Sequence, residues 1–113
     1  MEIVRSERET YLEIFKALSD PVRMEMFTQI ASAGDDEYRC TALVRDLAVG
    51  KSTISYHMRI LSQAGLISVR KEGRNFRYRV RTDVADHFLP HLVSRLGEPV
   101  AAPDEDAAER DLA

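Results

Sequence analysis

Apolar residues recur at helical spacing through the first third of the chain. A helix over residues 7–18 is the first that this spacing predicts. Its apolar residues are Tyr11, Leu12, Phe15 and Leu18. Asp20 and Pro21 then indicate the start of a second helix, because the aspartate can accept hydrogen bonds from first-turn amides and a proline at the first helical position needs no donor. We expect this second helix to continue over residues 22–33 and to end at Gly34.

Two shorter helices are predicted to follow. Residues 34–39 have the composition of a loop, and Thr41 is placed to cap a third helix over residues 42–48. A turn at Val49 and Gly50 then leads into a fourth helix over residues 51–64.

After Gly65 the period changes from helical to two. Residues 66–72 and 75–81 alternate between apolar and polar positions, with Gly73 and Arg74 between the two runs. In the second run one face carries Phe76, Tyr78 and Val80, and the other carries Arg77, Arg79 and Arg81. This pattern predicts an antiparallel hairpin with a basic tip and one apolar face.

The last periodic segment predicts a fifth helix over residues 83–96, capped by Thr82 and bent at Pro90. Residues 98–113 are rich in proline, alanine and acidic residues without an apolar period, so we expect a disordered acidic tail. Four helices, a hairpin and a fifth helix predict a mainly α fold, a winged helix-turn-helix, within one domain over residues 1–97.

Composition narrows the class of protein. The chain has 113 residues and one cysteine, Cys40, so a disulfide-built secreted scaffold is not expected. The first ten residues lack the apolar run of a signal peptide, and no stretch approaches the roughly 18 apolar residues of a membrane span. We therefore expect a cytoplasmic protein.

The formal net charge of −3 hides a strong segregation of charge along the chain. Residues 1–38 carry 4 basic and 9 acidic groups, residues 39–81 carry 10 basic and 2 acidic groups, and residues 82–113 carry 2 basic and 8 acidic groups. The central segment therefore has a net charge of +8 between two acidic segments. Such a block predicts a local surface that binds anions, above all nucleic acid.

The fourth helix divides into an apolar and a polar face. On a helical wheel of about 100° per residue, Ile54, Met58 and Leu61 fall together, and hydroxyl, amide, phenol and guanidinium groups fall opposite. No Asp or Glu occurs between Lys51 and Val69, which favours an anionic partner over a plain solvated face. From this helix and the wing we predict DNA contacts by Lys51, Ser52, Thr53, Ser55, Tyr56, His57, Arg59, Gln63, Arg74 and Arg77.

His57 permits two interpretations, because it lies within the apolar arc of this helix. It is either a packed histidine bonded to backbone or a contact to a phosphate or base. The arginines of the hairpin, by contrast, are expected to lie along the DNA backbone or in the minor groove, where they supply affinity and salt dependence.

Four segments in register resemble the ArsR/SmtB repressors. They are ALSDPVR at residues 17–23, STISYHMRIL at residues 52–61, AGLI at residues 64–67, and EGR at residues 72–74 followed by Tyr78. The resemblance implies a dimeric bacterial or archaeal repressor that pairs through its first and last helices, binds an imperfect palindrome and often releases DNA when an inducer binds. One local departure is Gly50, where the family usually has a serine cap, and glycine is a tolerable substitute.

Many proteins of this family sense metals, so the ligand positions matter. Cys40 alone cannot build a trigonal thiolate site, and the zinc-type ligand spacing of the last helix is absent. Asp83, His87 and His91 nevertheless share an i, i+4, i+8 face of the predicted last helix, so a divalent-metal-responsive repressor using the two histidines stays an alternative. We expect neither a bound metal nor another cofactor.

The leading hypothesis is a sequence-specific repressor of double-stranded DNA whose inducer is an organic molecule, or which has none. Two copies are expected to pair through Leu12, Phe15, Val84, Phe88 and Leu92. This pairing would set two reading helices about 34 Å apart, one turn of a palindromic operator. A winged-helix protein-interaction module is the alternative of a different class. An enzyme is not expected, because the chain has no nucleophile elbow, phosphate loop or paired carboxylates beside a pocket.

Overall fold

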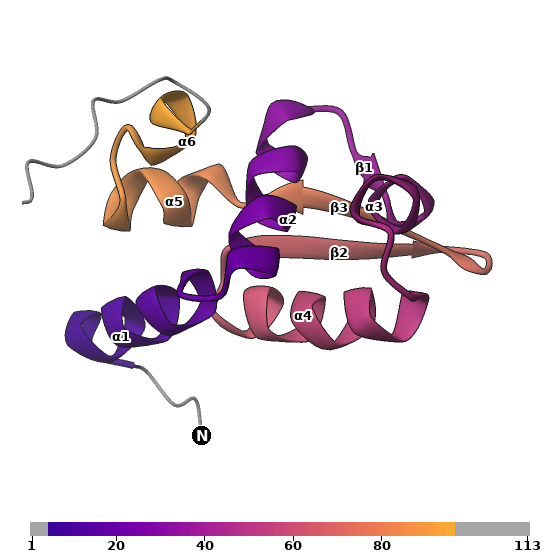
Figure 1. The fold of residues 1–113 in the computed structure, drawn as a ribbon. Coiled ribbons are helices and arrows are strands. Elements are labelled where there is room, and N and C mark those ends of the chain that lie inside the picture. The colour runs from indigo at the N-terminus through magenta and orange to yellow at the C-terminus, as the bar shows by residue number, and fades with distance from the viewer. Residues whose placement is uncertain (1–4, 97–113) are drawn as a thin grey trace, which may run out of the picture.

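The computed structural model describes residues 5–96, which fold as the sequence predicts into a winged helix-turn-helix (Figure 1). The predicted disordered tail at residues 98–113 lies outside the described residues. In chain order the elements are α1 (Glu7–Leu18), α2 (Pro21–Ser32), β1 (Tyr38–Arg39), α3 (Cys40–Leu47), α4 (Lys51–Gln63), β2 (Ile67–Glu72), β3 (Asn75–Val80), α5 (Thr82–Phe88) and α6 (Leu92–Arg95).

The start of α2 has the predicted cap. Oδ2 of Asp20 accepts hydrogen bonds from the backbone N–H groups of Val22, at 2.9 Å, and Arg23, at 3.0 Å. These bonds hold the pKa of Asp20 below its usual range, because the charged carboxylate is the better acceptor. The helix ends before Gly34, whose φ of +60° is the left-handed conformation that glycine adopts without strain.

Two other predicted caps are wrong. α3 begins at Cys40, one residue before Thr41, and α5 begins at Thr82 itself. The N-cap residues are Arg39 and Arg81, and neither caps its helix with a side-chain hydrogen bond.

The sheet has three strands rather than the predicted two. Residues 38 and 39, expected to be loop, form β1 and pair antiparallel with β3, so the strand order is β1-β3-β2. A strand of two residues is too short to show a period in the sequence. Its register places Tyr38 opposite Tyr78 and Arg39 opposite Arg77.

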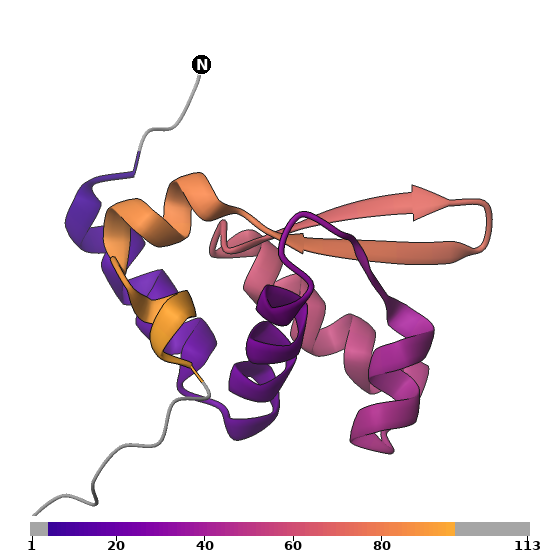
Figure 2. The same ribbon diagram turned by 90° about the horizontal axis from the view of Figure 1, so that it is seen from above.

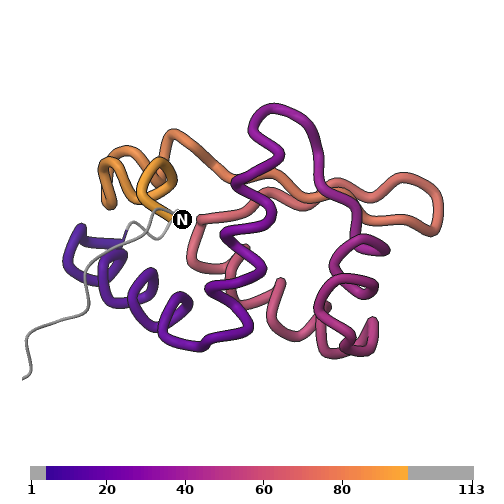
Figure 3. Tube along the Cα trace, turned by 45° about the horizontal axis from the view of Figure 1, so that its top comes forward, coloured from indigo at the N-terminus to yellow at the C-terminus, as the bar shows by residue number. Residues whose placement is uncertain are grey.

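A core of apolar side chains lies where α2 and α4 cover the sheet. Phe27 of α2, Leu43 of α3, Ile54 and Leu61 of α4, and Leu66 at the start of the hairpin are fully buried. In Figure 2 the hairpin extends past the helices at one end of the molecule, while α1, α5 and α6 gather at the other. The tube in Figure 3 follows the same path, so the first and last described segments share one end.

The predicted single bent helix over residues 83–96 is wrong. α5 ends at Phe88, and α6 begins only at Leu92. Pro90 has no N–H to donate and pushes Leu89 out of the helical region, where ψ is 63°. His91 then adopts φ of +68°, so the chain turns instead of bending smoothly.

Candidate nucleic-acid interface

The two helices of the helix-turn-helix meet at a tight turn. α3 ends at Leu47, and Ala48 takes the left-handed conformation with φ of +53°. Gly50 is the N-cap of α4, with extended φ and ψ and no side-chain cap. α4 therefore begins with amide groups that no side chain caps, which is where phosphate groups bind helices.

The two faces of α4 lie as the wheel predicts. Ile54, Met58 and Leu61 are buried in the core. The outer face is exposed and carries Lys51, Ser52, Thr53, Ser55, Tyr56, Arg59 and Gln63. Tyr56 leaves 57% of its surface exposed although it is a large aromatic residue. The arrangement leaves a polar, acid-free helix face free to enter a groove, and the contacts of these residues with DNA stay predictions.

His57 is half-buried and serves the packing of α4 against α2. Its Nδ1 lies 3.1 Å from Nη1 of Arg23, and it accepts this hydrogen bond because a guanidinium can only donate. Arg23 also donates from Nε to the carbonyl of Ala17, at 2.7 Å, at the end of α1. His57 thus bonds to a side chain, not to backbone as one interpretation expected. Only Nε2 of His57 remains available for the predicted contact with DNA.

Arg23 joins three helices, a role that the sequence pattern does not indicate. It sits in the first turn of α2, bonds the last turn of α1 and reaches α4 through His57. Only its partners in space reveal the role, since an arginine near a helix start has no signature of its own.

Carboxylates neutralise three of the six cations of the wing, which are Arg70, Lys71, Arg74, Arg77, Arg79 and Arg81. Arg70 forms ion pairs with Glu37, at 3.0 Å, and Glu72, at 2.9 Å. Nε of Arg77 lies 2.9 Å from Glu72, and Arg81 pairs with Asp83 at 2.9 Å. The other three cations of the wing, Lys71, Arg74 and Arg79, pair with no carboxylate among the described residues.

The arginines of the wing lower the pKa values of the two glutamates beside them. The hydrogen bond from Arg70 is the largest cause for both Glu37 and Glu72, and Arg77 adds to the effect on Glu72. The carboxylates therefore stay charged and position the arginines they contact. Of the two predicted wing contacts, Arg74 is exposed, whereas Arg77 is partly buried and partnered.

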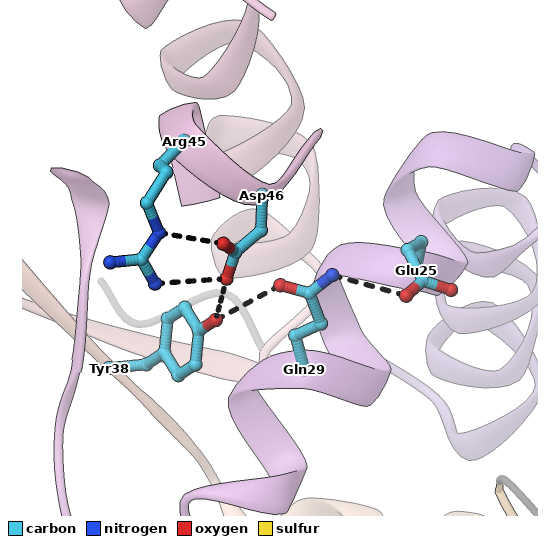
Figure 4. Close-up of polar contacts among 5 residues, drawn as sticks. All are labelled: Glu25, Gln29, Tyr38, Arg45 and Asp46. Carbon is cyan, nitrogen blue, oxygen red and sulfur yellow. Dashed lines mark hydrogen bonds and ion pairs between the residues drawn. The ribbon is translucent and has the colours of Figure 1, made fainter. Parts of the chain in front are cut away.

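A polar network fixes α3 against α2 and β1 (Figure 4). The hydroxyl of Tyr38 lies 3.0 Å from both Oε1 of Gln29 and Oδ2 of Asp46. Arg45 donates to the Asp46 carboxylate, and Gln29 donates to Glu25. Partial burial is the main cause that raises the pKa of Tyr38, followed by Asp46. The network sets the position of α3 and so of the turn into α4.

The histidines considered as metal ligands do not share a helix face. His87 belongs to α5, and its Nε2 lies 2.7 Å from the carboxylate of Glu7 in α1. His91 lies beyond the break at Pro90. Within residues 5–96 no three His, Cys, Asp or Glu side chains gather closely enough to hold a metal ion.

The end of the molecule opposite the wing carries an exposed apolar surface. On α1, Leu12 is 60% exposed and Phe15 is 55% exposed. Tyr11 packs edge-on against Phe88 of α5, with ring centroids 5.0 Å apart. The other residues predicted for the dimer interface, Val84, Phe88 and Leu92, are half-buried against the core. These five residues therefore lie on adjacent elements at one end.

Fold and surface together define a winged-helix DNA-binding protein. A helix-turn-helix domain model matches residues 18–70. The chain is 31% identical over 96 residues to the uncharacterized HTH-type transcriptional regulator YceK of Bacillus subtilis, covering 85% of this chain and 95% of YceK. It is 35% identical to the HTH-type transcriptional repressor SmtB of Mycobacterium tuberculosis strain H37Rv, covering 84% of this chain and 63% of SmtB.

A solved structure agrees with these relatives. An ArsR-like transcriptional regulator from Rhodococcus sp. RHA1 superimposes with a TM-score of 0.62 at 26% identity, covering 94% of this chain and 87% of that one. The protein belongs to the ArsR/SmtB family of helix-turn-helix transcriptional regulators. It is a DNA-binding regulator and not an enzyme. In the described part of the chain, no helix is long and apolar enough to cross a membrane.

Proposed function

We propose that the protein is a homodimeric, sequence-specific repressor that acts in the cytoplasm on a palindromic operator. The single observation that carries the proposal is the exposed outer face of α4. Hydroxyl, amide, phenol and guanidinium groups project from it, and no carboxylate occurs from Lys51 to Val69. Such groups bond to base edges and phosphates in the major groove.

The wing serves affinity more than sequence choice in this proposal. Lys71, Arg74 and Arg79 lie on a hairpin that extends past the helices and keep their charges free of the carboxylates described. Free cations at the edge of a DNA-reading surface release counterions when they meet phosphate, which makes binding steeply dependent on salt.

Dimerisation is proposed through Leu12 and Phe15 together with Val84, Phe88 and Leu92. Exposed leucine and phenylalanine side chains that lie one turn apart on α1 are more stable when a second copy covers them. A twofold axis at this end would place the two α4 helices about one turn of DNA apart, roughly 34 Å.

The inducer in this proposal is an organic molecule rather than a metalloid bound by thiolates. Cys40 is the one cysteine of the chain and is buried, so a site of several thiolates cannot form within one protomer. His87 meets a carboxylate of α1, which is a structural role for a residue otherwise considered as a metal ligand.

Fluorescence anisotropy on DNA from upstream of the protein's own gene tests the proposal, with scrambled DNA of equal length as control. We expect tight binding that prefers the native DNA and falls steeply with salt. Addition of zinc or of a chelator should leave it unchanged. Equal binding to both DNAs would contradict sequence-specific repression and favour a protein-interaction module. A zinc effect would contradict an organic inducer.

A further inference from the structure

We propose that the cleft between β3, the start of α3 and the start of α4 binds a small organic anion, namely an oxyanion group carried on an apolar body. The cleft has a volume of about 580 Å³, within the range of small-molecule sites. The cleft shares Lys51, Arg74 and Arg77 with the predicted DNA contacts, and its other lining residues were not predicted to touch DNA.

Among the described residues, four cations and no carboxylate line the cleft. They come from three places in the chain: Arg39 before α3, Lys51 at the start of α4, and Arg74 and Arg77 in the hairpin. Only Arg77 among them has a carboxylate neighbour in the described structure, which is Glu72 outside the cleft. An anion in the cleft would meet three cations that no carboxylate of residues 5–96 neutralises.

The register of the sheet brings like charges together at the cleft. Arg39 of β1 and Arg70 of β2 both lie directly opposite Arg77 of β3, so three arginines form a row across the sheet. Like charges in this position destabilise a sheet. Glu37 and Glu72 balance the Arg70 side of the row, whereas Arg39 has no carboxylate partner among residues 5–96.

Partly satisfied and uncapped N–H groups add to this positive potential. Nε of Arg77 is buried and pairs with Glu72 at 2.9 Å, outside ideal hydrogen-bonding geometry, so this donor is only partly satisfied among the described residues. α3 and α4 both start at the cleft, and neither start is capped by a side chain. Buried donors and free helix amides are the groups that bind an oxyanion.

The floor of the cleft is apolar. Cys40 is buried, and Val44 and Phe76 are half-buried against the core, yet all three line the cleft. Their surface suits an aromatic ring or short alkyl chain. A bare phosphate would use the cations and leave this surface in contact with water, so we assign the ligand as an oxyanion with an apolar body.

Occupancy of the cleft would compete with DNA. Lys51 and Arg74 line the cleft and also belong to the surface proposed to contact DNA. A bound anion would neutralise both, so it would lower the affinity for every DNA sequence. This last step rests on the proposed function, whereas binding of the anion does not.

Isothermal titration calorimetry in phosphate-free buffer and without DNA tests the site. The probes are phenyl phosphate, inorganic phosphate and phenol. We expect phenyl phosphate to bind more tightly than either of the others. Arg39→Gln should weaken that binding about tenfold, as expected for one charge-assisted hydrogen bond. Thr41→Trp, which fills the cleft from an exposed position without removing charge, should abolish it.

Arg45→Gln is the matched control, because Arg45 lies on α3 outside the cleft and pairs with Asp46. An equal loss in this variant would show a diffuse electrostatic effect and overturn the proposal. So would equal binding of inorganic and phenyl phosphate. If phenyl phosphate does not bind but Arg39→Gln weakens DNA binding, the cleft is a contact to the DNA backbone and the proposal fails.

Competition between phenyl phosphate and operator DNA, measured by anisotropy, is a separate second step. Displacement of DNA from the unchanged protein but not from Thr41→Trp is expected. Anion binding without displacement would overturn the regulatory part alone. Absence of DNA binding under all conditions would contradict the proposed function and leave the calorimetric result intact.

Discussion

Tyr38 has one hydroxyl hydrogen for two acceptors, Gln29 and Asp46, both at 3.0 Å. It ties α2 and α3 to the first strand, so its removal should be felt in stability. We expect Tyr38→Phe to lower the free energy of unfolding by about 1 kcal/mol, the net contribution of one hydrogen bond.

Urea unfolding followed by circular dichroism measures this change. Tyr56→Phe is the control and should leave stability unchanged, because Tyr56 is exposed and forms no hydrogen bond with the described side chains. If Tyr56→Phe destabilises the protein as much as Tyr38→Phe does, the network contributes nothing specific.

Arg59 and Arg74 occupy the two parts of the proposed DNA surface, α4 and the tip of the hairpin. Arg59→Ala should reduce the preference for the operator over scrambled DNA. Arg74→Ala should weaken both DNAs alike and reduce the salt slope by about one. Anisotropy on both DNAs over a salt series separates the effects. Equal loss of preference in the two variants would contradict this division between reading helix and wing.

Two glycines flank helix α4 in different backbone conformations, Gly50 before it and Gly65 after it. At Gly50 φ is −70°, and a Cβ there would meet no atom within 4 Å. Gly50→Ser adds the missing cap and should stabilise the protein by a few tenths of a kcal/mol. At Gly65 φ is +84°, so Gly65→Ala should destabilise it by about 1–2 kcal/mol.

Thermal and urea unfolding of the two variants measure both changes. They are each other's control, because each adds a side chain at one end of the same helix. Stabilisation by both substitutions would mean that Gly65 is not held in the left-handed conformation in solution.

At the scale of the whole molecule, the apolar end formed by α1 and α5 decides the oligomeric state. Leu12→Glu combined with Phe15→Glu should convert a dimer to a monomer, since these side chains are 60% and 55% exposed in one chain. Little change in the fold is expected from residues this exposed. Light scattering after gel filtration gives the mass, and operator affinity should fall with dimerisation.

Val69→Lys is the control for surface hydrophobicity, because Val69 is also exposed but lies on the wing. A dimer that survives the double substitution on α1, or a monomer produced by Val69→Lys, would place the interface elsewhere.

The charge pairs of the molecule predict how stability depends on pH. Arg45 lowers the pKa of Asp46, Arg81 lowers that of Asp83, and Arg70 lowers that of Glu37. A carboxyl group with a lowered pKa in the folded state stabilises the fold above its unfolded pKa and loses this contribution as pH falls through the folded value. Stability should thus hold above about pH 5 and decline through about pH 4 and below.

Urea unfolding at a series of pH values checks this decline, and added salt should reduce it because the pairs are exposed. A rise in stability between neutral pH and about pH 4 would contradict the assigned direction of these pKa shifts.

The order of elements was largely determined by local sequence. Asp20 and Pro21 begin α2 because a cap and a proline act within one helical turn. The alternation of Phe76, Tyr78 and Val80 predicts β3 because side chains of a strand alternate between faces regardless of what covers them. The apolar stripe of α4 likewise assigned its buried face in advance, and the opposite face became the candidate DNA surface.

Tertiary structure decided what depends on partners distant in the chain. β1 is a strand only because β3 pairs with it, and Arg70 gains Glu37 as an ion-pair partner, beside its neighbour Glu72, only because the fold brings Glu37 to it. The break between α5 and α6 follows from the local effect of Pro90, yet how far the chain turns there depends on packing against the core. Sequence patterns indicate short-range geometry. Only folding brings together the segments that form the ion pair of Arg70 with Glu37, the hydrogen bond between Arg23 and His57, and the cleft proposed to bind an anion.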